Sequence, residues 1–121
     1  MRYVLSLAFA LFAIFPANAD QAQLDRGRAI YAEHCTLCHG ADGRRGQGFQ
    51  TPIWGPQTQI AKFQNALGLF EYNEVLMPFD GPDKIDEPAK WAVTLYLLVN
   101  HGAMQAGQTL SRANAATIPI R

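Results

Sequence analysis

The sequence of 121 residues has little of what identifies several large protein classes. It contains two cysteines, too few for a disulfide-rich scaffold. Its ten basic residues balance its ten acidic residues, so the total charge predicts no binding to nucleic acid or to an anionic membrane. Hydrophobic residues make up 49% of the chain, which excludes a disordered protein and favours one soluble globular domain.

Long hydrophobic runs are also scarce, and the one at residues 4–15 is too short to cross the roughly 30 Å apolar core of a bilayer comfortably. Arg2 precedes it, and Pro16 and small residues follow it. This order is typical of a secretory signal peptide. We expect cleavage after Ala19 and export to the periplasm, with no stable membrane insertion afterwards. The alternative, an uncleaved anchor, is disfavoured because Pro16 would break a continuing helix.

The predicted domains are therefore a signal peptide, residues 1–19, and one mature domain, residues 20–121. A domain of about 100 residues buries only about two thirds of its unfolded surface, so a bound group that adds to its core would stabilise it.

Both cysteines lie in one short motif, Cys35-Thr36-Leu37-Cys38-His39, which reads Cys-x-x-Cys-His. This is the attachment pattern for haem c. Thiols at i and i+3 share one side of a helical turn, where they can form thioethers with the two vinyl groups of a haem. His39 can then present a neutral imidazole nitrogen to the iron. The motif predicts one covalent haem c with His39 as its proximal ligand.

Two other uses of the motif are weaker. A redox-active Cys-x-x-Cys requires a strand before the motif, whereas the preceding residues predict a helix. A structural zinc site requires four ligands, and only His34 and His101 could join this cluster.

The helix before the motif is predicted from about Gln23 to Tyr31, with an apolar stripe that contains Gly27. Glycine costs a helix roughly 1 kcal/mol relative to alanine, so its place in the stripe indicates close contact with another helix. A tolerated surface glycine is the alternative.

Four features in this order resemble class I cytochrome c. They are Gly27-x-x-x-Tyr31, Cys35-x-x-Cys38-His39-Gly40, Met77-Pro78 and Tyr96-Leu97. The resemblance covers essentially the whole mature chain. It implies an all-α cytochrome c fold with three to four helices around one haem and an irregular C-terminal tail. It also implies that Gly27 and Tyr31 contact Val93 and Tyr96.

The second axial ligand could come from Met77, Met104, His34 or His101. His34 is adjacent to the proximal motif, and His101 and Met104 follow the final predicted helix. Met77 lies in a loop before Pro78, and this position matches the distal ligand loop of the family. The resemblance therefore assigns Met77 to the iron, and a methionine that fills a gap in the core is the alternative.

The segment between His39 and Met77 is expected to support the haem. Its first part is rich in glycine and includes Arg44 and Arg45, which predicts a flexible polar loop. The resemblance implies that a proline carbonyl accepts the other N–H of His39, with Pro52 the first candidate and Pro56 the second. Trp54 either lines the haem or packs in the core.

Two later helices are expected on either side of Met77. An apolar stripe precedes it and could cover the distal face of the haem; its members are Leu69, Phe70, Tyr72, Val75 and Leu76. The final helix is predicted from Glu87 to about Val99, with Asp86 as its N-terminal cap.

Residues 69–82, 91–98 and the tail are similar to a narrower group, the cytochrome subunits of periplasmic molybdenum sulfite dehydrogenases and sulfur-oxidising dehydrogenases. This similarity implies a one-electron carrier that accepts electrons from a dehydrogenase, passes them on to a respiratory acceptor, and transforms no substrate itself. The alternative is a haem c enzyme or gas sensor with five-coordinate iron.

Overall fold

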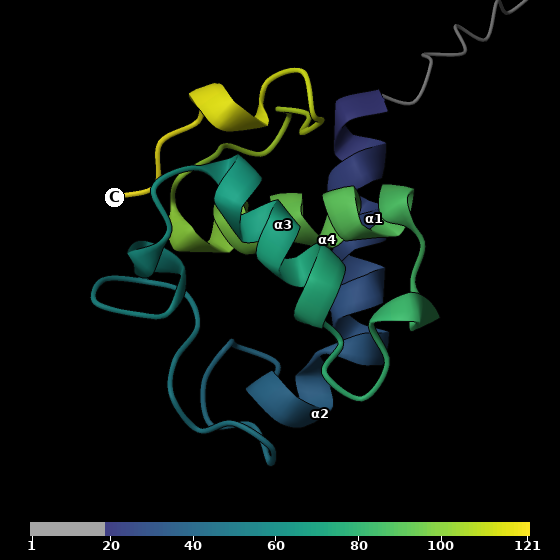
Figure 1. Ribbon diagram of the computed structural model, residues 1–121, viewed down its shortest axis with the longest axis vertical. Helices are drawn as coiled ribbons and strands as arrows, with labels where there is room; N and C mark the ends of the chain where they lie inside the picture. The colour runs from purple at the N-terminus through teal and green to yellow at the C-terminus, as the bar shows by residue number, and fades with distance from the viewer. Residues whose placement is uncertain (1–18) are drawn as a thin grey trace, which may run out of the picture.

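A computed structural model describes residues 19–121, with side chains from residue 21 onward, and most of the expected signal peptide lies outside this range. The four α-helices are α1 (Ala19–His34), α2 (Thr36–His39), α3 (Ala66–Leu76) and α4 (Glu87–His101), and the 3-10 helices are η1 (Ile60–Lys62), η2 (Pro82–Lys84) and η3 (Ala115–Thr117) (Figure 1). This confirms the all-α prediction. None of these helices is long and apolar enough to cross a membrane.

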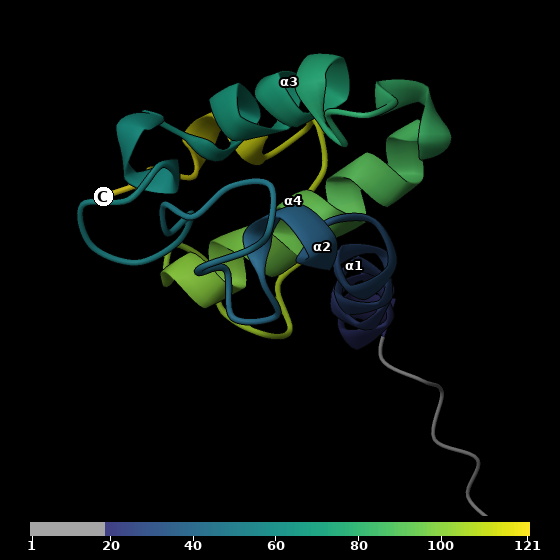
Figure 2. The same cartoon turned by 90° about the horizontal axis from the view of Figure 1, so that it is seen from below.

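The centre of the fold is α4, which packs against α1 on one side and α3 on the other (Figure 2). A Cβ atom on Gly27 of α1 would lie 2.0 Å from the carbonyl oxygen of Ala92 and 3.0 Å from Cβ of Tyr96. The rings of Tyr31 and Tyr96 are 5.2 Å apart. The predicted crossing of the first and last helices is confirmed, with Ala92 rather than Val93 against the glycine.

Helix α1 is longer than the apolar stripe predicted, because it extends at both ends through polar residues and alanines that favour helix. Helix α4 begins as predicted. Asp86 caps it, with Oδ1 accepting a hydrogen bond from the N–H of Ala89 at 3.0 Å. Gly102 caps its C-terminal end, and the φ of 89° at this residue is left-handed, a conformation that favours glycine.

The apolar stripe on α3 divides between two environments. Phe70 is fully buried, and its ring stacks on that of Trp91 with centroids 3.4 Å apart. Leu69 is also in the core. Tyr72 and Leu76 instead remain about two fifths exposed. Only part of the stripe is therefore available to cover a ligand, since the rest joins α3 to α4.

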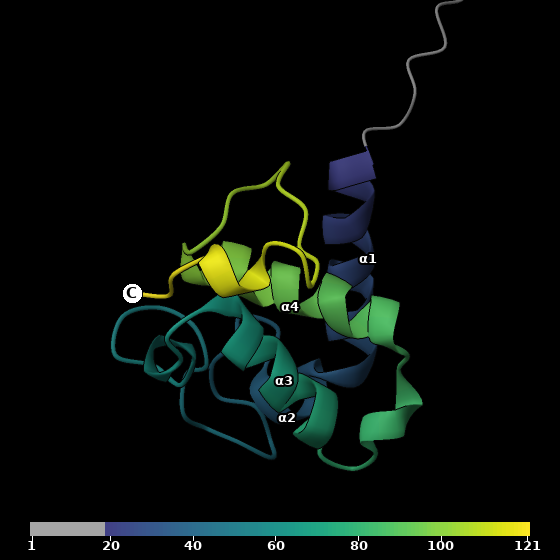
Figure 3. The same ribbon diagram turned by 45° about the horizontal axis from the view of Figure 1, so that its top comes forward.

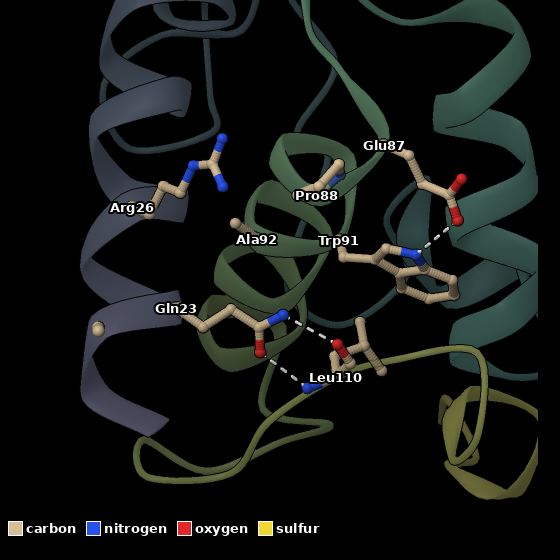
Figure 4. Close-up of a pocket in the computed structure, with 8 residues that line it drawn as sticks. Gln23, Arg26, Glu87, Pro88, Trp91, Ala92 and Leu110 are labelled. Atoms are coloured by element: carbon tan, nitrogen blue, oxygen red, sulfur yellow. Dashed lines mark hydrogen bonds between the residues drawn. The ribbon is translucent and has the colours of Figure 1, made fainter. Parts of the chain in front are cut away.

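The C-terminal tail is irregular, as predicted, and hydrogen bonds hold it against the helices. The N–H of Ala66 donates to Ile118 at 2.9 Å, which places η3 beside the start of α3 (Figure 3). The side-chain amide of Gln23 on α1 exchanges two hydrogen bonds with the backbone of Leu110, each 2.8 Å long (Figure 4). The tail thus connects α1 to α3 across α4.

Candidate functional site

The two cysteines and His39 lie on a short continuation of α1. Cys35 forms the junction between α1 and α2: its N–H donates to Tyr31 and its carbonyl accepts from His39, both at 2.9 Å. Cys35 is half-buried and Cys38 is exposed, and the two thiols do not form a disulfide. The structure therefore places two free thiols and an imidazole on one helical turn, as the motif requires.

Burial affects the protonation of this turn. It raises the pKa of the Cys35 thiol to about 12, with a smaller contribution from the nearby Cys38. It lowers the pKa of His39 below its ordinary value of 6.5. A neutral imidazole is the form that binds a metal, so the environment of His39 favours a ligand over a cation.

The ring of His39 has one polar atom without a partner. Its Nδ1 is buried and makes no hydrogen bond within the described part of the chain. The ring of Phe49 lies edge-on to it, with centroids 5.5 Å apart. The carbonyl of Pro52, the predicted acceptor for His39, accepts from the N–H of Gln59 at 3.4 Å. The pairing of Pro52 with His39 stays a prediction.

The glycine-rich segment after the motif packs closely against it instead of forming a loose loop. A Cβ on Gly46 would lie 1.9 Å from the carbonyl oxygen of Cys38, and one on Gly48 would lie 2.9 Å from its Sγ. The N–H groups of Gln47 and Phe49 donate to Leu37 and Cys38, both at 2.9 Å. Glycine is needed here because the backbone passes within contact distance of the attachment turn.

Trp54 belongs to an aromatic cluster behind this segment. It is 9% exposed, and its ring lies 5.4 Å from that of Tyr31 and 6.2 Å from that of Tyr96. Gly43 packs directly on the indole. These contacts show that Trp54 packs in the hydrophobic core. Its contact with a haem stays a prediction.

Met77 follows the last residue of α3 and caps its C-terminal end. It is half-buried, and its N–H donates to the carbonyl of Asn73 at 3.1 Å. Its own carbonyl accepts a hydrogen bond from Nζ of Lys90 on α4. Lys90 is also near enough to Cys35 for its positive charge to lower the pKa of that thiol. One lysine therefore contacts the loop of the predicted distal ligand and lies close to the proximal motif.

The other candidate ligands have different environments. Met104 is 5% exposed and packs in the hydrophobic core. Both ring nitrogens of His101 have backbone partners, with Nδ1 accepting from Gly55 at 3.0 Å and Nε2 3.1 Å from the carbonyl oxygen of Arg121. His34 lies 3.7 Å from Glu33.

The residues of this site fit a haem. The motif offers two free thiols and a neutral imidazole, which is the donor set for covalent attachment and axial ligation. Phe49, whose ring lies edge-on to His39, is 38% exposed, and a large apolar group bound at the motif would remove it from water. Within residues 21–121, no group of three or more His, Cys, Asp and Glu side chains is placed to hold a metal ion.

Sequence reasoning missed two residues that support the site. Tyr31 was expected only to pack, yet its hydroxyl also donates to Gly40, the residue after His39, at 2.6 Å. Lys90 was not singled out, although it stands within an otherwise apolar stretch of α4. A charged residue at a position where the helix pattern requires burial is the signal that could have found it.

An all-helical domain with a Cys-x-x-Cys-His turn on a short second helix defines a class, the proteins that carry haem c. The family described as cytochrome C oxidase, cbb3-type, subunit III matches residues 22–97. The chain belongs to this cytochrome c family, and it is an electron-transfer cytochrome.

Comparisons with individual proteins agree with this assignment. The chain is 27% identical over 84 residues to the thiosulfate dehydrogenase of Allochromatium vinosum. This match covers 61% of this chain and 30% of that protein. It superimposes on the sulfane dehydrogenase SoxCD from Paracoccus pantotrophus with a TM-score of 0.69 at 20% identity, covering 80% of this chain and 52% of the other. This likeness shows the fold. The chain therefore spans about half or less of the length of these relatives.

A third similarity is to the thiosulfate dehydrogenase TsdBA from Marichromatium purpuratum. Identity is 33%, the TM-score is 0.47, and the match covers 60% of this chain and 17% of the other.

Proposed function

We propose that the protein is a periplasmic electron carrier with one haem c, attached through Cys35 and Cys38 and held at the iron by His39 and Met77. In this role the domain would accept single electrons from a dehydrogenase and pass them to a respiratory acceptor. The observation that carries the proposal is the turn from Cys35 to His39, which presents two free thiols and a half-buried imidazole whose pKa is lowered by burial.

The surroundings of that turn support a fixed proximal ligand. The absence of side chains at Gly46 and Gly48 lets this segment pack against Cys38. The hydroxyl of Tyr31 donates a hydrogen bond to the carbonyl of Gly40. His39 therefore lies between two backbone segments that are held by hydrogen bonds. Restraint of this kind reduces the rearrangement that accompanies a change of charge at the iron.

Exposure of the motif supports electron exchange with a partner. Leu37, between the two cysteines, is 70% exposed, and Cys38 is also exposed. Haem c, when bound, supplies a one-electron couple between ferric and ferrous iron, and ligation by a methionine sulfur raises its potential relative to two histidines. A small apolar patch beside the attachment turn suits the brief contacts of redox proteins.

The donor that we propose is a sulfur-oxidising dehydrogenase, with a molybdenum sulfite dehydrogenase as the specific candidate. The similarity to a thiosulfate dehydrogenase and to the sulfane dehydrogenase SoxCD supports this class of partner. Oxidation of sulfite releases two electrons, so the dehydrogenase would reduce this carrier twice for each substrate molecule.

Haem attachment and ligation are tested with purified, exported protein. We expect haem to stay with the unaltered chain after denaturation. In the double variant Cys35→Ala/Cys38→Ala, we expect denaturation to release it. We expect the far-red charge-transfer band of a sulfur-ligated ferric haem to disappear in Met77→Ala and to persist in Met104→Leu. A persistent band in Met77→Ala would assign the sulfur ligand to another residue and overturn the Met77 assignment. Rapid carbon monoxide binding by the unaltered ferrous protein would favour five-coordinate iron.

The donor is tested in periplasmic extract from the native organism. The oxidised cytochrome is added to extract with sulfite, thiosulfate or no substrate, and its reduction is followed optically. We expect sulfite to reduce it through a co-purifying molybdenum protein. Reduction by thiosulfate alone would move the assignment to the other sulfur dehydrogenases, and no reduction by either would reject the proposed class of donor.

A further inference from the structure

Lys90 is a buried cation in the middle of the fold. It lies in the first half of α4 and is only 3% exposed. Lysine is almost never fully buried unless its charge is paired. Within the described part of the chain, no carboxylate lies within ion-pair distance of its Nζ. Its ammonium group must therefore be stabilised in another way.

Three backbone carbonyls provide that stabilisation. Nζ of Lys90 donates to the carbonyl of Asn73 at 2.8 Å, to that of Glu74 at 3.1 Å, and to that of Met77. An ammonium group has three N–H donors, so each donor has one acceptor. The side chain is thus fully satisfied without a counter-ion.

These acceptors are the carbonyls that end α3. In a helix the carbonyl of Glu74 would accept from the N–H four residues later, but that residue is Pro78, which has no N–H. The last carbonyls of a helix also carry its negative dipole end, which a cation stabilises. Lys90 therefore supplies, from another helix, the donor that Pro78 lacks.

We propose that Lys90 is the positioning residue for the methionine ligand, because it anchors the backbone of Met77 to α4 and so fixes where the thioether begins. This inference rests on the proposed role of Met77. A thioether is a weak ligand, and it competes with external ligands whenever its loop opens. An anchor on its carbonyl reduces the fraction of time that the loop is open.

The test measures imidazole binding to the ferric, haem-loaded protein. Imidazole binds only when Met77 has left the iron, so its apparent affinity reports the open fraction. We expect Lys90→Met to bind imidazole about tenfold or more tightly. This change in affinity corresponds to the loss of one hydrogen bond from a charged group. Lys90→Gln retains an amide donor and should give a smaller increase. It also keeps the test valid if Lys90→Met does not fold.

Two controls separate positioning from general destabilisation. Lys84→Met also removes one lysine charge, from η2 between α3 and α4, but this side chain is half exposed and forms an ion pair with Asp80. Leu110→Ala removes a core side chain from the distant tail. We expect both to bind imidazole like the unaltered protein, although Leu110→Ala unfolds at lower urea concentration.

The outcomes are distinguishable. If the unaltered protein lacks the charge-transfer band of sulfur ligation, the proposed role of Met77 fails. If the band is present and folded Lys90→Met and Lys90→Gln bind imidazole no more tightly than Lys84→Met, the positioning role of Lys90 is rejected. An equal increase in Leu110→Ala would also reject it, because the effect would then follow from stability alone.

Discussion

The hydroxyl of Tyr31 donates a hydrogen bond of 2.6 Å to the carbonyl of Gly40, so the first helix is tied to the residue directly after His39. The same ring packs on Trp54 and Tyr96. Tyr31 therefore joins the crossing of α1 and α4 to the attachment turn. A change in this side chain should affect both stability and the segment that follows the proximal ligand.

Tyr31→Phe should lower the free energy of unfolding by about 1 kcal/mol at neutral pH, because it removes the shorter of the two hydrogen bonds to the carbonyl of Gly40 and leaves only that from the N–H of Gly43 at 3.2 Å. The measurement is urea denaturation followed by circular dichroism. Tyr72→Phe is the matched control, since Tyr72 is exposed and its substitution should change stability by less than about 0.5 kcal/mol. Equal effects of the two substitutions would contradict the role of this hydrogen bond.

The Tyr31 phenol should also make stability depend on alkaline pH. Burial raises the pKa of Tyr31 above its ordinary value of 10.0, and the nearby Cys35 raises it further. The stabilisation from this difference is fully present below pH 10 and is lost as the pH rises above it, because the unfolded chain then releases the proton first. Unfolding free energies measured from pH 8 to pH 11 should therefore fall more steeply in the unaltered protein than in Tyr31→Phe.

Gly27→Ala should force α1 away from α4. The added Cβ would lie 2.0 Å from a backbone oxygen of Ala92, which cannot rotate away. Overpacking of this kind costs about 1–3 kcal/mol or more, and denaturant titration would detect it as a lower midpoint. Gly68→Ala in α3 is the control, because its Cβ would be 3.7 Å from the nearest side chain. It should stabilise the helix by up to about 1 kcal/mol. Loss of stability in both variants to the same degree would argue against a specific contact at Gly27.

The attachment turn could be predicted from local spacing, because Cys35, Cys38 and His39 share one turn. Spacing also places Gly27 and Tyr31 on one helical stripe, whereas their contact with the last helix was implied by the resemblance to class I cytochrome c. The division of the α3 stripe was not predictable in the same way. Phe70 and Tyr72 are both aromatic, but only the position of α4 decides that Phe70 stacks on Trp91 and is buried.

Contacts between distant segments were missed for a related reason. The charge of Lys90 suggests a surface position, although the helix pattern around it predicts burial, and it is buried because α3 ends against it with free carbonyls. Gln23 and Leu110 are 87 residues apart, and no sequence pattern links an amide on the first helix to a backbone in the tail.

Gln23→Ala should loosen the tail. Its amide oxygen and nitrogen both bind the backbone of Leu110, so the substitution leaves a part-buried donor and acceptor unpaired (Figure 4). We expect a loss of about 1–3 kcal/mol and faster hydrogen exchange at the Leu110 amide. Gln21→Ala is the control, since Gln21 is exposed and bonds only to Asp25. Unchanged exchange at Leu110 would show that the tail is held by other contacts.

His101 should stabilise the fold without binding the iron. Its Nδ1 accepts from the N–H of Gly55, so Nε2 carries the proton and donates to the carbonyl of Arg121. His101→Phe retains a ring of similar size but loses both bonds. We expect a loss of about 1–2 kcal/mol in denaturant titration and faster hydrogen exchange at the Gly55 amide.

His34→Phe is the matched variant for ligation, because His34 and His101 were the histidine alternatives to Met77. The ion-pair partner of His34 is the exposed Glu33, 3.7 Å away, so its substitution should change stability little. If Met77 binds the iron, both variants keep the far-red charge-transfer band, and only His101→Phe is destabilised. Absence of the band in the unaltered protein, together with a changed ferric haem spectrum in one folded variant, would identify that histidine as the distal ligand and predict a lower potential than methionine ligation gives.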